Sequence, residues 1–169
     1  KTLMNQTLKA LYALIRIALK EERPVEFPES VDWIELLEYA KTQGVAAIAM
    51  DGLQTLINKI GFSPVGLDVK AKLQLYALAM SIERRHIKQI ESGKEVASIW
   101  HKAGIRTLVL KGFAFAQYYP KPMQRLASDM DCYLCGGYEV GNREMECLGI
   151  KVNREDYRHA TFQYKDVFV

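Results

Sequence analysis

Apolar residues recur every three or four positions through the first hundred residues, which is the spacing of amphipathic helices. The pattern predicts helices over residues 2–21, 31–43 and 45–59, the second capped by Ser30 and ended by Gly44. A fourth helix is predicted over residues 68–102, with a bend at Gly93. Its first half is apolar nearly all round, as in a central buried helix. Its second half carries a narrower apolar stripe, made of Ile87, Ile90, Val96, Ile99 and Trp100.

After Gly104 the pattern changes to short apolar runs rich in β-branched residues, which are typical of buried strands. Strands are predicted at residues 105–110, 130–134, 150–153, 161–164 and 167–169, and helices at 113–119 and 138–148. We therefore predict an α+β protein with two domains. Residues 1–103 form an all-helical bundle, and residues 104–169 form a lobe of mixed β-sheet with flanking helices.

Composition narrows the class of protein further. Lys and Arg number 23 against 20 Asp and Glu, a net charge of +3, and no basic run interleaves with aromatic residues. Strong sequence-independent binding of nucleic acid is therefore not favoured. No apolar stretch approaches the ~20 residues that cross a bilayer, so no membrane contact is expected. Three cysteines make no disulfide framework, which favours the cytoplasm. Because the chain begins with Lys1 and ends on an apolar run, we expect a fragment.

Two acids separated by one residue, Asp129 and Asp131, form the strongest chemical signal. In a strand, residues i and i+2 project from the same face, so the two carboxylates would lie side by side. Such a pair either raises one pKa or binds a divalent metal, and hard oxygen ligands suit Mg²⁺. The alternative is a solvated strand end or turn that happens to carry two acids.

A second signal lies seventeen residues upstream, where the strand predicted at 105–110 meets Lys111 and Gly112. A helix is predicted to follow at once, and the N-terminus of a helix binds anions such as phosphate. A glycine there lets an anion approach the backbone, and Lys111 adds positive charge. The alternative is that Gly112 serves only the tight turn and that Lys111 is an ordinary surface residue.

Together these features resemble a known family. Leu110-Lys111-Gly112, Tyr119-Pro120-Lys121-Pro122, Arg125 and Ser128-Asp129-Met130-Asp131 are similar to the motifs of the uncharacterised bacterial nucleotidyltransferases of the DNA polymerase beta-like superfamily. The resemblance is strongest over residues 105–134. It implies a truncated nucleotidyltransferase-like sheet in which Asp129 and Asp131 are catalytic and hold Mg²⁺ or Mn²⁺. It also implies that Lys111, Gly112, Arg125 and Ser128 bind a nucleoside triphosphate.

The implied reaction transfers a nucleoside monophosphate to an acceptor hydroxyl, with a small molecule or a protein favoured over RNA as the acceptor. Arg125 would steady the phosphates or simply pair with Asp129. Two departures from the family pattern stand out. Phe113 replaces the serine that usually follows the glycine, and a third carboxylate is expected on the strand where the chain stops, with only Asp166 near it. The alternative function is a catalytically inactive module that acts through protein–protein contacts.

Other polar residues receive weaker interpretations. Cys132, Cys135, Cys147 and His159 have a spacing that can hold zinc, but a strand at 130–134 would point Cys132 into the core instead. His86 lies among basic residues and is expected on the surface, whereas His159 can reach the site from a neighbouring strand. Tyr118 and Tyr119 are expected to pack, with base stacking as the alternative.

Overall fold

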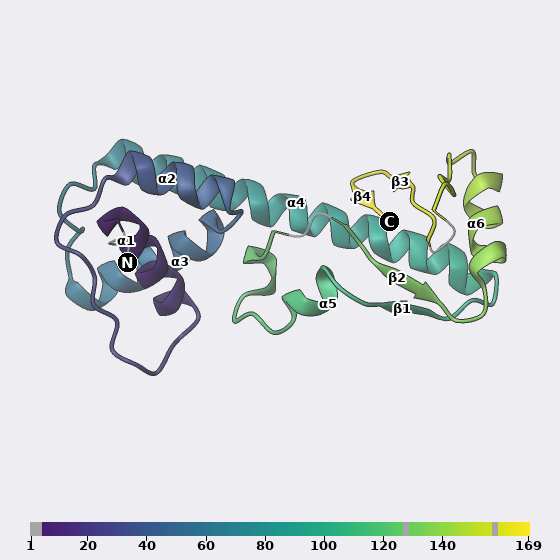
Figure 1. Cartoon of the computed structure of the whole chain (residues 1–169), viewed down its shortest axis with the longest axis horizontal. Coiled ribbons are helices and arrows are strands. Elements are labelled where there is room, and N and C mark those ends of the chain that lie inside the picture. Colours follow the sequence, from purple (N-terminus) through teal and green to yellow (C-terminus); the bar gives the residue numbers. More distant parts are fainter. Residues whose placement is uncertain (1–4, 127–128, 157–158) are drawn as a thin grey trace. The chain divides into compact units, whose positions relative to one another are not determined.

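The computed structural model describes residues 5–126, 129–156 and 159–169. It confirms the α+β class, with helices first and short strands after them (Figure 1). The chain forms two compact units, which are described separately below. The first comprises Lys1–Arg84 and Tyr119–Leu126, and the second Arg85–Tyr118 and Ala127–Val169. This division falls inside a helix, and the domain boundary predicted near residue 103 stays a prediction.

The first unit is helical. It contains α1 (Gln6–Ala18), α2 (Trp33–Thr42), α3 (Ala46–Ile60), the first half of α4 (Val69–Lys102) and the short 3-10 helix η1 (Pro122–Gln124). Its core includes the fully buried side chains of Leu14, Leu36, Leu53 and Leu75. Helices α1 and α3 approach closely at Gly52, where a Cβ atom would lie 2.0 Å from the Leu14 carbonyl oxygen.

The start of α2 differs from the prediction. Asp32, not Ser30, is the N-cap, and its carboxylate accepts hydrogen bonds from the backbone N–H groups of Ile34 and Glu35, both at 3.0 Å. Both residue types are good caps, so the sequence alone offered two starting points two residues apart.

Helix α4 also differs from the prediction in both halves. Its first half buries one face only, formed by Ala71, Leu75, Ala79 and Ile82, whereas Leu73 and Tyr76 are exposed. It is therefore a surface helix of its unit and not a central one. The second half continues through Gly93 as helix, and the bend predicted there stays a prediction.

The buried stripe of the second half of α4 is more polar than predicted. It contains His86, Gln89 and Ser92, while Ile87 is 43% exposed. The prediction of His86 as a surface residue was wrong, because its imidazole packs edge-on against the ring of Phe113, with 5.5 Å between the ring centroids. Apolar periodicity cannot reveal this stripe, since its members are not apolar.

The second unit adds short strands to α4. Strand β1 (Thr107–Val109) pairs antiparallel with β2 (Cys132–Leu134), and β3 (Gln163–Tyr164) pairs antiparallel with β4 (Val167–Phe168) (Figure 1). A parallel bridge between Asp129 and Phe168 connects the two ladders, with the Met130 N–H donating to the Phe168 carbonyl at 2.8 Å. The arrangement is therefore mixed, as predicted.

The helices of the second unit are α5 (Phe113–Ala116), shorter than predicted, and α6 (Tyr138–Cys147). The core contains Val96, Trp100, Met130, Met145 and Val167 among its buried residues. The Trp100 indole N–H donates to the carbonyl of Gly141 at 3.1 Å, which fixes α6 against α4.

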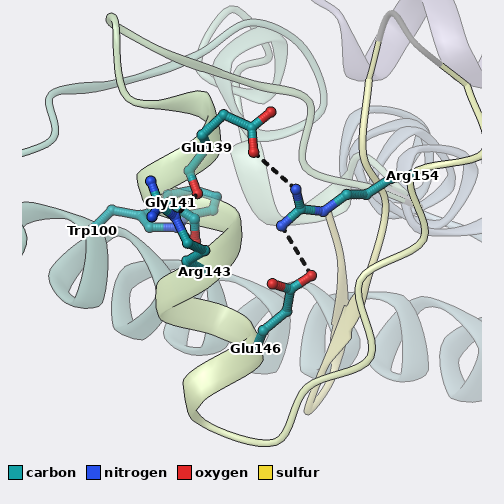
Figure 2. Close-up of polar contacts among 6 residues, drawn as sticks. All are labelled: Trp100, Glu139, Gly141, Arg143, Glu146 and Arg154. Carbon is teal, nitrogen blue, oxygen red and sulfur yellow. Dashed lines mark hydrogen bonds and ion pairs between the residues drawn. The ribbon is translucent and has the colours of Figure 1, made fainter.

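A single arginine holds the segment after α6 to that helix. Figure 2 shows Arg154 between Glu139 and Glu146, with 2.9 Å from guanidinium nitrogen to carboxylate oxygen on each side. The two acids lie seven residues apart on α6 and therefore share one face of it.

Among the described residues, no helix is both long and apolar enough to cross a membrane.

Candidate functional site

Asp129 and Asp131 lie on one face of the strand segment that leads into β2. Asp129 is exposed, Met130 between them is 3% exposed, and the Asp131 side chain is 40% exposed. This alternation directs Met130 into the core and both carboxylates outward. Their face, which we call the carboxylate face, also carries the exposed side chains of Leu108, Leu110, Tyr133 and Phe168.

Gly112 lies directly against the strand that carries the acids. Its φ is +60°, and a Cβ atom at this position would lie 2.5 Å from the carbonyl oxygen of Asp129. Only a residue without a side chain allows that approach. The turn between β1 and α5 is therefore packed on the first acid.

Lys111 contacts the second acid, with 3.5 Å between its Nζ and Oδ2 of Asp131. Both side chains are largely accessible to solvent, so this pair is weak and its ammonium group can turn toward a bound anion. The structure thus brings together four residues that the sequence singled out: Lys111, Gly112, Asp129 and Asp131.

The helix after Gly112 has four residues, so its dipole is small. Phe113, which stands where the resemblance leads one to expect serine, is partly buried in the core and meets His86. The apolar side chain of Phe113 therefore holds the turn between β1 and α5 against the core of the second unit. Positive charge near the acids comes from Lys111 more than from the helix.

Cys132 points to the core side of β2, as predicted. Burial, with a smaller contribution from the charge of Asp131, raises the pKa of its thiol to about 12. A thiol held protonated in this way is a poor zinc ligand. Among the described residues, no group of three or more His, Cys, Asp or Glu side chains is placed to hold a metal ion, so the zinc alternative has no support.

A comparison with family models decides what kind of protein this is. The model described as an uncharacterised nucleotidyltransferase matches residues 29–169, most of the chain. The chain belongs to this family. Neither the curated proteins nor the solved structures contain a match. Membership supports a general nucleotidyltransfer function, and it implies a nucleotide as substrate.

For two further residues of the predicted nucleotidyltransferase site, Arg125 and Ser128, the predicted role stays a prediction. Arg125 belongs to the first unit, where it caps η1, and Ser128 lies outside the described residues. Lys121, from the same proline-rich loop as Arg125, forms an ion pair with Asp51 in the first unit. The loop is held there by Leu126 as well, whose Cδ2 would lie 2.8 Å from a Cβ on Gly44.

A cavity of about 670 Å³ opens beside the acids of this nucleotidyltransferase. Asp129, Asp131, Lys111 and His159 are among its lining residues, and Nδ1 of His159 lies 3.6 Å from a carboxylate oxygen of Asp156. His159 therefore lies near the site, as the sequence suggested. Asn142 lines the same cavity but was not singled out, because an amide on a helix gives no sequence signal.

Tyr118 does not fulfil the packing expectation. It is 84% exposed, whereas Tyr119 is partly buried. Asp166 lies in the turn between β3 and β4 and is exposed, and its backbone N–H donates to the Ser92 hydroxyl at 3.4 Å.

Proposed function

We propose that this nucleotidyltransferase transfers a nucleoside monophosphate from a nucleoside triphosphate to an acceptor hydroxyl, with a divalent metal held by Asp129 and Asp131. The acceptor oxygen forms a bond to the α-phosphorus and loses its proton, and the bond to the β-phosphate breaks to release pyrophosphate. One observation carries the proposal. Gly112 packs on the backbone of Asp129, and the Lys111 ammonium lies 3.5 Å from Asp131. These contacts support a site in which the acids would bind a cation and the turn would bind phosphate.

The donor set fits Mg²⁺ or Mn²⁺. Both acids supply hard oxygen atoms, both are accessible, and they project from one strand face. Mg²⁺ commonly takes one or two carboxylates and completes its shell with water and substrate phosphates, so a third protein ligand is not required for binding. A metal bound there would neutralise the charge that develops on the transferred phosphoryl group.

The chain's own residues would hold the triphosphate in place. Gly112 keeps the turn against the strand that carries the acids, and Lys111 supplies a mobile positive charge. Arg125 and Ser128 are proposed to contact the same phosphates. Small molecules and proteins are favoured over RNA as acceptors, because the chain has no basic run that would track a nucleic-acid backbone.

Calorimetry tests the metal role. The parent chain is titrated with ATP, GTP, CTP and UTP in Mg²⁺, and then the Asp129→Asn/Asp131→Asn variant is titrated in the same way. We expect at least one triphosphate to bind the parent and the double variant to bind it at least about tenfold more weakly. Glu91→Gln/Glu155→Gln removes the same charge from exposed positions of the same unit and should bind as the parent does. Binding that ignores the loss of both aspartates would rule the metal role out.

A second candidate function is a non-catalytic module that binds another protein. It is favoured by exposed apolar side chains of the first unit, each at least 51% exposed: Phe62, Val65, Val69, Leu73 and Tyr76. The titration separates the two candidates, because a binding module predicts no uptake of any triphosphate by the parent chain.

A further inference from the structure

The first half of α4 carries a second apolar face, on the side turned away from the core of its unit. Leu75 packs in that core, and Leu73, two residues before it, lies on nearly the opposite side of the helix. Val69, Leu73 and Tyr76 are 75%, 61% and 51% exposed. They are spaced by four and three residues and so lie along one side, which the partly buried Met80 continues. We call Val69, Leu73, Tyr76 and Met80 the outer face of α4.

A helix that is apolar on two sides needs neighbours on both. A surface helix has one apolar stripe with polar residues opposite it, whereas a helix that is apolar nearly all round is a buried one. Among the described residues, the core cluster of the first unit includes Leu75 and Leu78 of α4 and no member of the outer face. Large apolar side chains that are exposed together mark an interaction surface. The outer face therefore calls for a further neighbour.

The spacing of the outer face indicates which kind of neighbour fits it. Steps of four, three and four residues are those of the a and d positions of a coiled coil. In a coiled coil, each side chain at these positions inserts between four side chains of the facing helix. The outer face runs over about three turns of α4, so a second helix laid along it would bury all four of its side chains.

The charges beside the outer face narrow the choice of partner. By helical spacing, Lys70 and Arg84 lie along one margin of it, and Lys72 and Glu83 lie along the other. Three of these four groups are basic. A second copy of this chain would bring the same excess of positive charge, which disfavours self-association. Acidic residues along the margins of a facing helix would pair with it instead.

We propose that the outer face of α4 binds an amphipathic helix of another protein, apolar at its a and d positions and acidic beside them. Leu73 and Tyr76 would insert between the apolar side chains of that helix. Lys70 and Arg84 would meet its acids at the rim, where charge sets the specificity and the rate of association. No residue of the outer face belongs to the carboxylate face, so this binding is independent of the transfer reaction.

Two labelled peptides test the binding in the absence of any nucleotide. One peptide has about three heptads with Leu at a and d and Glu at e and g, and the other has Lys in place of every Glu. Fluorescence anisotropy measures the affinity of each peptide for the whole chain. We expect the acidic peptide to bind at least about tenfold more tightly than the basic one. This preference should shrink in about 1 M salt, which screens the charges.

A pair of matched variants locates the contact. Leu73→Ser/Tyr76→Ser should weaken binding of the acidic peptide at least about tenfold, because it removes two apolar side chains from the middle of the outer face. Tyr12→Ser/Ile34→Ser removes a tyrosine and an aliphatic side chain from exposed positions of α1 and α2 and should bind as the parent does. Circular dichroism checks that the helices of each variant are intact.

Charge reversal is a second test, which leaves the apolar side chains in place. Lys70→Glu/Arg84→Glu should shift the preference to the basic peptide. Failure of the acidic peptide to bind, equal affinity for the two peptides, or affinities that neither variant of α4 changes would overturn the proposal. A dimer of the parent chain in sedimentation, lost in Leu73→Ser/Tyr76→Ser, would assign the outer face to a second copy instead. Binding to vesicles of anionic phospholipid and to neither peptide would assign it to a membrane surface.

Discussion

The contact between Gly112 and Asp129 predicts that Gly112→Ala is the most damaging single-methyl change near the acids. The new Cβ would lie 2.5 Å from a backbone oxygen, and real Cβ atoms essentially never come closer than 3.0 Å. The turn and the strand would therefore separate by about 0.5 Å or more. The residue would also keep a φ of +60°, which L residues adopt only with strain.

Gly136→Ala is the matched control for this substitution. Gly136 has a φ of +73° in the same unit, but nothing lies within 4 Å of its Cβ position. Gly136→Ala should lower the unfolding free energy only by the cost of holding a residue with a Cβ at a positive φ, about 1 kcal/mol. Gly112→Ala adds the displacement of Asp129, so we expect a loss of about 3 kcal/mol.

Urea unfolding followed by tryptophan fluorescence measures both losses. A Trp33→Phe background leaves Trp100, which lies in the core of the second unit, as the reporter. Triphosphate binding of each variant is measured by calorimetry on the same samples, and Gly112→Ala alone should weaken it, at least tenfold, because a displaced acid misplaces the metal. Equal stability losses in the two variants, or binding that Gly112→Ala leaves intact, would refute the reasoning.

Two other predictions follow from the ionisable groups of the second unit. The hydrogen bond from Lys165 holds the pKa of Glu95 below its ordinary value of 4.5, so the bond stabilises the fold at neutral pH and its contribution is lost as the pH falls through the lowered pKa. Glu95→Gln should therefore lower the melting temperature at pH 7 relative to the parent, and this difference should vanish in acid. A difference in melting temperature that does not change with pH would contradict this. An equal lowering by Glu91→Gln, which changes an exposed acid, would also contradict it. Burial raises the pKa of the Cys132 thiol to about 12, so iodoacetamide at pH 8 should alkylate the exposed Cys147 before Cys132. Mass spectrometry of digested peptides measures both rates, and faster labelling of Cys132 would show that its thiol is not buried.

The acids and the turn could be predicted from sequence because local rules decide them. The alternation of a strand sends Asp129 and Asp131 to one side whatever the strand packs against, and a glycine between a strand and a helix marks a tight turn. The sequence could not show that Gly112 rests on the carbonyl of Asp129, because seventeen residues separate them and only the β1–β2 pairing brings them together.

The helical region shows where local rules fail. Leu73 and Tyr76 made the first half of α4 look apolar on all sides, but both side chains are exposed. Periodicity predicts that a segment is helical and does not show how deeply the helix is buried. His86 is buried because Phe113 comes over it from a distant segment. Gly93, where a bend was predicted, gives space to the side chain of Met130. Sequence periodicity shows none of these three features, because each depends on how segments distant in sequence pack.

At Gly93, helix α4 packs against the strand segment that carries Asp129 and Asp131. A Cβ on Gly93 would lie 2.9 Å from the sulfur of Met130, the residue between the two acids. An alanine at position 93 would displace the flexible end of the Met130 side chain, and a larger residue there would require a smaller or differently shaped residue at position 130. Relatives of this chain that carry a larger residue at position 93 should accordingly carry a smaller or differently shaped one at position 130.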